Sequence, residues 1–320
     1  MSRTKTPILR QTGKGFSYFS FIADYWKAKE SGWDRAFHRL CSLMRKMDAQ
    51  HVIIEKLEST DNEVSEESTA LNTYYGKKTG LDAYRFTFLS QKISNLSDVK
   101  FLSDDKFFSS AILINFIDDK SKWHSYLHKA VVCIPKISGE PLLNNYIHIR
   151  KDFTCSVNLG KGVSRFFSIN GTYFCQQNSV TSVCAHASLC MIINNMDRPG
   201  SEMISNEWIN TTLRINHTSK KVGPDRGLKE HEVMQVLEKA GLKANWHNFF
   251  DDPNSDYAEY VYRYIEGKCP ALLIFSTHHS DALHVVPVIG HTLNSDFGER
   301  KQIWLTTRRF TCTIDPRLNG

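Results

Sequence analysis

One cysteine of this chain lies where an activated thiol would be expected. Cys184 follows a polar, hydroxyl-rich loop and begins a run of small and apolar residues, 182–196, that is typical of a buried helix. The thiolate is the nucleophilic form of cysteine, and the partial positive charge at a helix N-terminus favours an anion. Thr181 and Ser182 are suitable helix N-caps, which would place Cys184 in the first helical turn. The pattern therefore predicts a nucleophilic cysteine.

A nucleophilic cysteine needs a base, and the nearest histidine in the sequence does not suit this role. His186 is two residues from Cys184, which on a helix is a rotation of about 200° and points it away. His284 follows a short polar loop, 277–283, and begins an apolar run predicted to form a strand. A histidine at the start of a strand can project into a cleft while the strand fixes its backbone. We therefore expect His284 to be the general base.

Acyl transfer also requires donors that stabilise the negative oxygen of the tetrahedral intermediate. The loss of one such donor typically costs about 2.7–4 kcal/mol of transition-state stabilisation. The backbone N–H of Cys184 is one predicted donor. The side-chain amide of Gln177, seven residues upstream, is the other. Together these residues predict a cysteine nucleophile, a histidine base and an oxyanion hole.

The elements that would position these residues can be predicted from hydrophobic periodicity and turn signals. An amphipathic helix at 32–48 is followed by a strand and then by an acidic segment, 58–69, predicted as a mobile surface loop. Further helices are expected at 182–196, 201–215, 228–240 and 255–266. Strands are expected at 51–57, 107–117, 126–135, 146–150, 153–157, 165–169, 270–276, 284–291 and 302–308.

Composition narrows the class of protein. With 41% hydrophobic and 23% charged residues, the 320-residue chain can form a core. A net charge of +6 is a mild excess of base, so we expect no nucleic-acid partner. No apolar window has the length of a membrane span and no secretory signal is evident, which predicts a soluble, cytoplasmic protein. Eight cysteines without a CxxC pair predict reduced thiols and no structural zinc.

The second half of the chain resembles the papain-like cysteine peptidases. A Gln-x6-Cys sequence opens a helix, several helices follow, and a Pro-led strand precedes His-Val-Val-Pro-Val-Ile-Gly-His. This order is similar to the compact bacterial branches of the family, such as the bacteriocin-processing peptidases, over about residues 172–310. The resemblance implies Cys184 as nucleophile, His284 as base and Gln177 as oxyanion donor. Asn178 takes the place where the family usually has its glutamine, so that Gln176 or Gln177 must reach the site.

The family also uses an Asn or Asp that orients the histidine. The candidates for this third residue are Asp315, Asp296 and Asn294, and the alternative that it is absent stays open. The implied fold class is α+β. The apolar runs and turn clusters predict a helix and a mainly antiparallel sheet for residues 1–170, and the resemblance implies a papain-like domain with a central helix packed on an antiparallel sheet for residues 171–320.

The function implied is a cysteine peptidase that cleaves peptide or isopeptide bonds through an acyl-enzyme at Cys184. No metal or organic cofactor is required by this chemistry. The partners would be a protein or peptide substrate and a regulatory protein bound through residues 1–170. Two alternatives use the same fold, namely an acyl transferase with the same Cys and His, and a catalytically inactive binding module.

Overall fold

The computed structural model describes most of the chain, as two compact units. The described residues are 6–28, 35–76, 79–133, 145–147, 150–178, 180–181, 183–198, 202–215, 227–249, 256–277, 280–292 and 309–315. The first unit comprises the described residues of Met1–Pro135 and Lys151–Thr181, and the second those of Lys136–Arg150, Ser182–His217 and Lys221–Gly320. The division thus falls at 181/182, whereas the sequence suggested 170/171.

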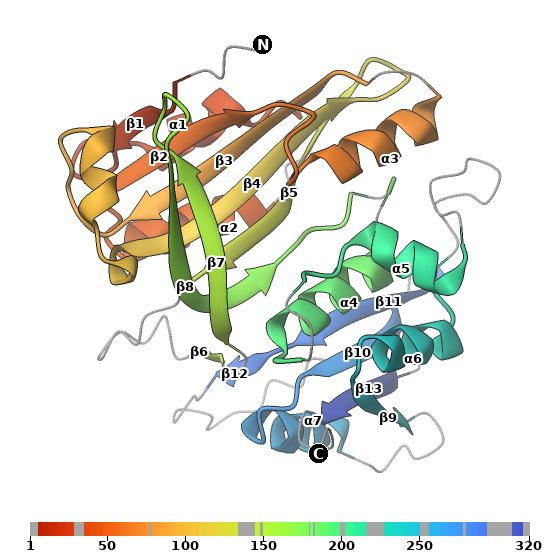
Figure 1. Cartoon of the computed structure of the whole chain (residues 1–320). Coiled ribbons are helices and arrows are strands. Elements are labelled where there is room, and N and C mark those ends of the chain that lie inside the picture. The colour runs from red at the N-terminus through yellow and green to blue at the C-terminus, as the bar shows by residue number, and fades with distance from the viewer. Residues whose placement is uncertain are drawn as a thin grey trace. The chain divides into compact units, whose positions relative to one another are not determined.

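The first unit is built on a curled, antiparallel sheet (Figure 1). Its strands follow the order β1-β2-β3-β4-β5-β8-β7, so the last hairpin joins the sheet through β8. The backbone N–H of Asn158, at the end of β7, donates to Glu55 Oε1 of β2 at 2.9 Å, which links two strands far apart in this order. The strand bounds are β1 (Ile8–Gln11), β2 (His51–Leu57), β3 (Leu81–Leu89), β4 (Phe107–Ile117), β5 (Trp123–Val132), β7 (Lys151–Asn158) and β8 (Ser164–Phe174).

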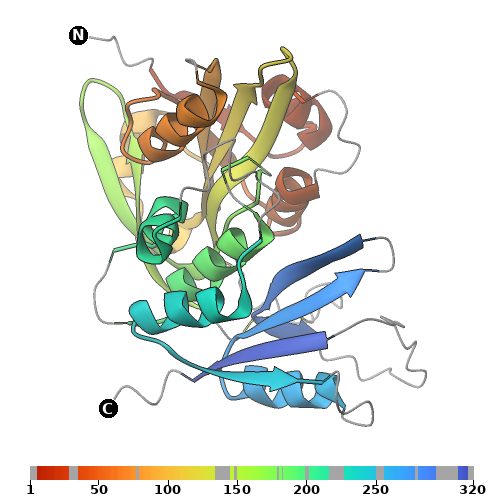
Figure 2. The ribbon, with the colours of Figure 1, turned by 90° about the vertical axis from the view of Figure 1, so that its right-hand side faces the viewer.

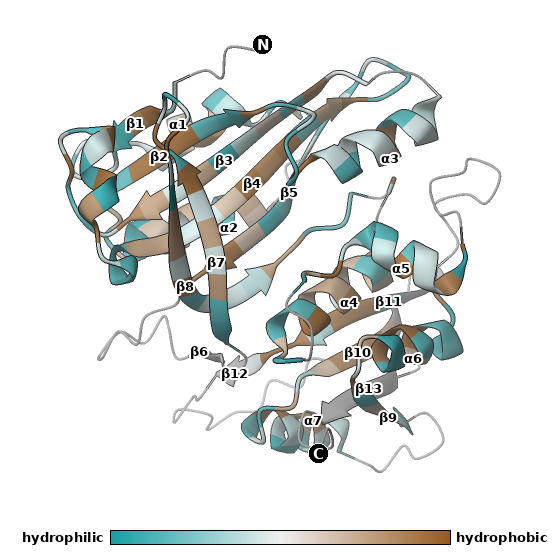
Figure 3. Cartoon of the chain, viewed as in Figure 1, coloured by the Kyte–Doolittle hydropathy of each residue, from teal (hydrophilic) through white to brown (hydrophobic). Residues whose placement is uncertain are grey.

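Helices supply the rest of the first unit's core. They are α1 (Tyr18–Tyr25), α2 (Arg35–Lys46) and α3 (Ser65–Tyr75), with short 3-10 turns η1 (Leu96–Phe101) and η2 (Asp104–Lys106). One face of α2 is buried, and its apolar residues recur at the helical spacing of the predicted amphipathic helix: Phe37, Leu40, Cys41 and Met44. Figure 3 shows the matching apolar colour along the central strands of the sheet. The aromatic rings of Phe21, Phe37 and Phe86 join α1, α2 and β3 in one cluster.

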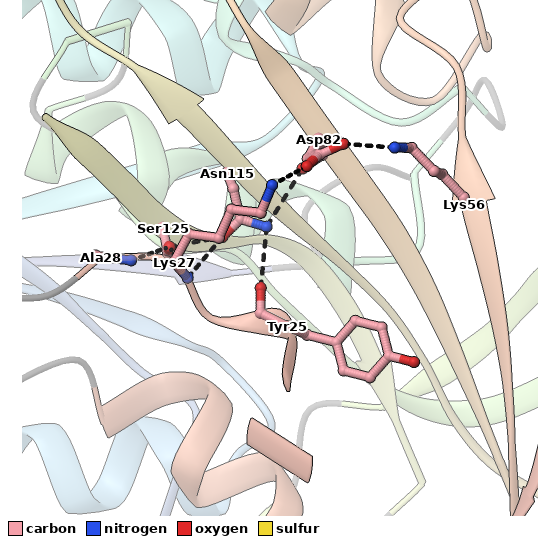
Figure 4. A network of polar contacts seen from close by, with 7 residues as sticks. All are labelled: Tyr25, Lys27, Ala28, Lys56, Asp82, Asn115 and Ser125. Carbon is pink, nitrogen blue, oxygen red and sulfur yellow. Dashed lines mark hydrogen bonds and ion pairs between the residues drawn. The ribbon is translucent and has the colours of Figure 1, made fainter. Parts of the chain in front are cut away.

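A polar network fixes the chain just after α1 on the sheet (Figure 4). Asn115, fully buried on β4, donates to the carbonyl of Tyr25 at 3.1 Å. Its Oδ1 accepts from the Ser125 hydroxyl at 2.6 Å. That hydroxyl oxygen accepts in turn from the backbone N–H groups of Lys27 at 3.0 Å and Ala28 at 2.9 Å. The buried side chains of Asn115 and Ser125 therefore form hydrogen bonds with backbone groups at the end of α1 and just after it.

Asp82 completes this network by pairing with two lysines. Its carboxylate binds the ammonium groups of Lys27 and Lys56, the latter at 2.7 Å (Figure 4). Burial by itself raises the pKa of Asp82, but the hydrogen bonds from the two lysines outweigh it and hold that pKa below its ordinary value. The carboxylate stays charged and joins β2, β3 and the segment after α1.

The second unit consists of helices and a four-stranded antiparallel sheet of order β11-β10-β13-β9. Figure 2 shows α4, α5 and α6 on one side of this sheet and α7 on the other. A separate two-stranded pair joins β6 to β12. The helices are α4 (Cys184–Asn195), α5 (Asn206–Leu213), α6 (Glu230–Lys239) and α7 (Tyr257–Glu266). The strands are β6 (Asn145–Ile147), β9 (Lys243–Asn248), β10 (Ala271–Thr277), β11 (Ser280–Val288), β12 (Gly290–Thr292) and β13 (Arg309–Asp315).

The α+β class is confirmed as a mixed architecture of helices and antiparallel sheets. Several local predictions are wrong, and α5 begins at Asn206 although its helix was predicted from 201. Residues 65–69 are not a loop but the start of α3, and residues 280–283 belong to β11 rather than to the loop before it. The strand predicted at 302–308 lies outside the described residues. In the part of the chain that the structure describes, every helix is too short or too polar to cross a bilayer.

We expect Gly171→Ala to destabilise the first unit. A Cβ at Gly171 would lie 2.5 Å from the carbonyl oxygen of Val132 and 2.8 Å from its carbonyl carbon, on the neighbouring strand. Overpacking of this kind typically costs about 1–3 kcal/mol. Gly13→Ala is the control, because its Cβ would make ordinary contacts, 3.6 Å at the nearest. Urea denaturation monitored by fluorescence should separate the two variants, and equal midpoints would contradict the close approach of β5 and β8.

Candidate active site

Cys184 is the first residue of α4, as the sequence predicted for a nucleophile at a helix start. Its side chain is half-buried. The cap, however, differs from the prediction, because the N-cap residue is Val183, which makes no side-chain cap. Thr181 does not cap α4 and instead donates its hydroxyl to Glu67 Oε1 at 2.5 Å. Ser182 lies outside the described residues.

The body of α4 is buried on nearly every side, which is unusual for a helix and indicates a central position. Small residues at its start are buried and allow close packing: Ala185, Ala187 and Ser188. The large apolar residues further along are at most 4% exposed: Leu189, Ile192, Ile193 and Met196. His186 is fully buried, and its Nε2 lies 3.1 Å from Asn210 Oδ1 of α5. It therefore faces α5, in agreement with the expectation that it is not the base.

One hydrogen bond ties α4 to the strand that carries His284. The hydroxyl of Ser188 donates to the carbonyl of Val285 at 2.8 Å, and both groups are buried. His284 is the residue before Val285, and Cys184 is four residues before Ser188, on the same face of the helix. The structure thus brings together the two elements that carry the predicted nucleophile and base.

His284 is the fifth residue of β11, so it does not begin the strand. It is half-buried and pairs with Phe275 of β10, with ring centroids 6.0 Å apart. Val285 pairs with Ile274, and both are buried, which places them on the opposite face of the sheet. β11 is the edge strand of this sheet.

Of the three candidates for the residue that orients His284, only Asp315 falls within the described chain. It is the last residue of β13. Arg309 and His284 both lie opposite Phe275, and Asp315 is six residues further along β13. This separation corresponds to about 20 Å at the usual rise of a strand. Asp315 therefore lies at the other end of the sheet from His284. Asn294 and Asp296 lie outside the described residues.

Gln177 is exposed and belongs to the first unit. Its neighbours use their amides within that unit. Gln176 Oε1 accepts from the backbone N–H of Leu127 at 3.0 Å. Asn178 donates to Glu67 Oε1 at 2.6 Å, while its own Oδ1 accepts from the backbone N–H groups of Val180 and Thr181. Gln177 is thus the exposed one of these three side-chain amides, and its role as oxyanion donor stays a prediction.

Glu67 organises the loop that precedes Cys184, and sequence reasoning missed it. The side chain is 4% exposed, and Oε1 accepts from the Tyr126 hydroxyl at 2.7 Å as well as from Asn178 and Thr181. Burial raises the pKa of Glu67 above its ordinary value, although the three hydrogen bonds lower it in part. A signal was present, because Glu67 stands four residues before Leu71 and so shares its helix face.

Most of the other described thiols are in environments that disfavour a thiolate or hide it, and Cys133 is half-buried. Seven of the described cysteines are free thiols: Cys41, Cys133, Cys155, Cys175, Cys184, Cys190 and Cys269. Burial raises the pKa of Cys41 well above its ordinary value and that of Cys155 to about 11. Cys175, Cys190 and Cys269 are buried. Among the described residues there is also no group of three His, Cys, Asp or Glu side chains that could hold a metal ion.

Comparison with known proteins adds no relative. No protein-family model matches the chain, and neither the curated proteins nor the solved structures contain a match. The resemblance to papain-like peptidases therefore rests on the residues of this chain.

We expect the stability contributed by Glu67 to fall as the pH rises. Its folded-state pKa is raised, so the folded chain binds more protons than the unfolded chain above the ordinary glutamate pKa of about 4.3. From there up to the raised pKa, each pH unit should cost wild type about 1.4 kcal/mol relative to Glu67→Gln, which cannot titrate. Urea denaturation between pH 4 and pH 7 measures this difference.

Glu66→Gln is the matched control, because Glu66 is adjacent and exposed and carries the same charge. Its stability should run parallel to that of wild type across this range. A constant difference between wild type and Glu67→Gln at all pH values would show that Glu67 does not have a raised pKa.

Proposed function

We propose that the chain is a thiol-dependent hydrolase that cleaves peptide or isopeptide bonds, with Cys184 as nucleophile and His284 as general base. The observation that carries this proposal is the hydrogen bond from Ser188 to the carbonyl of Val285. It joins the cysteine-headed helix to the histidine-bearing strand within one unit. The order of elements in that unit, helices followed by an antiparallel sheet, supports a papain-like arrangement.

The surroundings of the thiols favour Cys184 over the other cysteines. A nucleophilic thiol must be both accessible and stabilised as an anion. Cys184 is half-buried at the N-terminus of a helix of twelve residues, where the helix dipole favours negative charge. Cys133 and Cys155 are also half-buried, but neither is at a helix N-terminus, and burial of the Cys155 thiol raises its pKa to about 11. At neutral pH we therefore expect Cys184 to react first.

In the proposed reaction Cys184 is the nucleophile, and His284 accepts and later donates the proton. His284 accepts the thiol proton of Cys184, and the thiolate forms a bond to the carbonyl carbon of the substrate. The C–N bond breaks as the imidazolium returns the proton to the departing amine. Water, deprotonated by His284, then hydrolyses the thioester. In this proposal the backbone N–H of Cys184, the first residue of α4, stabilises the developing oxyanion.

Acylation by p-nitrophenyl acetate tests the assignment without knowledge of the natural substrate. We expect a burst of nitrophenol and an acetyl group on Cys184, located by peptide mass spectrometry. Cys184→Ala should abolish the burst, whereas Cys155→Ser should keep it. His284→Gln should slow acylation by about 10²–10⁴-fold, which is the usual contribution of a general base. Thermal denaturation of each variant checks that the second unit stays folded.

Two results would contradict the proposal. The first is acetylation of several cysteines, and the second is a burst that His284→Gln leaves unchanged in a folded protein. Either outcome would favour an inactive binding module. Release of acetyl-amine products when primary amines are added would instead identify an acyl transferase, which uses the same two residues with a different acceptor.

A further inference from the structure

A polar pocket of about 490 Å³ lies within the first unit. It is bounded by β2 and β3, by the loop between β2 and α3, and by the β7–β8 hairpin. The strands supply Glu55 and Arg85, the loop supplies Glu58 and Glu63, and the hairpin supplies Ser164. All of these residues belong to one unit, so the pocket does not depend on the site at Cys184.

The charges that line this pocket are mainly negative. Glu55, Glu58, Asp61 and Glu63 are carboxylates, and only Lys56 and Arg85 among the lining residues are cationic. Lys56 is already paired, because its ammonium group binds Asp82, which is not one of the lining residues, at 2.7 Å. An electrostatic preference for a positively charged ligand follows.

The cations near the pocket are already paired, which disfavours an anionic ligand. Arg85 is 6% exposed and binds both Glu55, at 3.1 Å, and Glu63. Lys129 binds Glu63 Oε1 at 2.5 Å, and burial lowers the pKa of this lysine to about 8. An anion would have to displace a carboxylate from each of these contacts.

Glu55 supplies an acceptor with no partner. One carboxylate oxygen, Oε1, accepts from Arg85 Nη1 at 3.1 Å and from the backbone N–H of Asn158 at 2.9 Å. The other, Oε2, is buried and has no hydrogen-bond partner within the part of the chain that the structure describes. The side chain is only 4% exposed. A buried carboxylate oxygen without a donor is costly, and a donor from a ligand would remove this cost.

We propose that this pocket binds an organic cation, an ammonium or guanidinium group, that donates to Glu55 Oε2. Two sources carry this group: a small free amine or guanidine, and the side chain of Lys or Arg in a peptide. Charge-assisted hydrogen bonds to a buried carboxylate are the stronger class and give the pocket its selectivity for cations.

Isothermal titration calorimetry of the full chain with butylguanidinium tests this proposal. We expect saturable binding, at least about tenfold weaker with Glu55→Gln, which removes the charge that assists the hydrogen bond. Ser164→Trp leaves Glu55 in place and fills the pocket mouth from an exposed position, so it should abolish binding even if Glu55→Gln fails to fold. Glu58→Gln is the control, because it makes the same charge change at an exposed position. Since solvent screens this charge, we expect the affinity for butylguanidinium to change by less than about threefold.

The chemistry and the source of the ligand are separated by further probes. 1-Butanol and butyrate have the same chain length without the cation and should not bind. A capped Gly-Arg-Gly peptide that binds more tightly than butylguanidinium identifies a peptide ligand, and the reverse order identifies a free small cation. The proposal is overturned if no cationic probe saturates, if 1-butanol binds equally well, or if folded Glu55→Gln and Ser164→Trp both bind as wild type does. None of these results depends on catalysis at Cys184.

Discussion

The buried carboxylate of Glu67 is the interaction on which the loop at 178–181 depends, and this loop precedes α4 in the sequence. It is held among the hydroxyl of Tyr126, the amide of Asn178 and the hydroxyl of Thr181, and so joins α3, β5 and the loop at 178–181. The same loop places Val180 in the hydrophobic core of the first unit. The loop is therefore fixed within the first unit, up to Thr181, by both polar and apolar contacts.

Within the second unit, the size of side chains on α4 decides what the helix can contact. Ala185, Ala187 and Ser188 are small and buried, and this allows a side-chain hydroxyl to reach the backbone of β11 directly. A larger residue at position 188 would both lose the hydrogen bond and increase the distance between helix and strand. Cys184 and Ser188 share one helix face, so the contact that positions the helix also determines where the thiol lies relative to β11.

Sequence patterns predicted the parts of the fold in which local and tertiary preferences agree. The strand at 51–57 matches β2 at both ends, and the buried face of α2 follows the apolar spacing of Phe37, Leu40 and Met44. α3 was missed because its sequence is acidic and hydroxyl-rich, and its burial depends on partners distant in sequence such as Tyr126. The register of β13 could not be read from one strand, since it depends on pairing with both β10 and β9. That register is what separates Asp315 from His284.

The two buried glutamates of the first unit show why hydrogen-bond satisfaction matters more than burial when function is inferred. Glu67 and Glu55 are equally buried, at 4% exposure, and burial raises the pKa of both. Oε1 of Glu67 accepts three side-chain donors that come from the same unit, which is the arrangement expected of a structural carboxylate. Glu55 has two donors on one oxygen and none on the other within the described chain, and it lines a pocket. The contacts within the folded unit account for the carboxylate of Glu67. Glu55 Oε2, in contrast, can accept a hydrogen bond from a ligand.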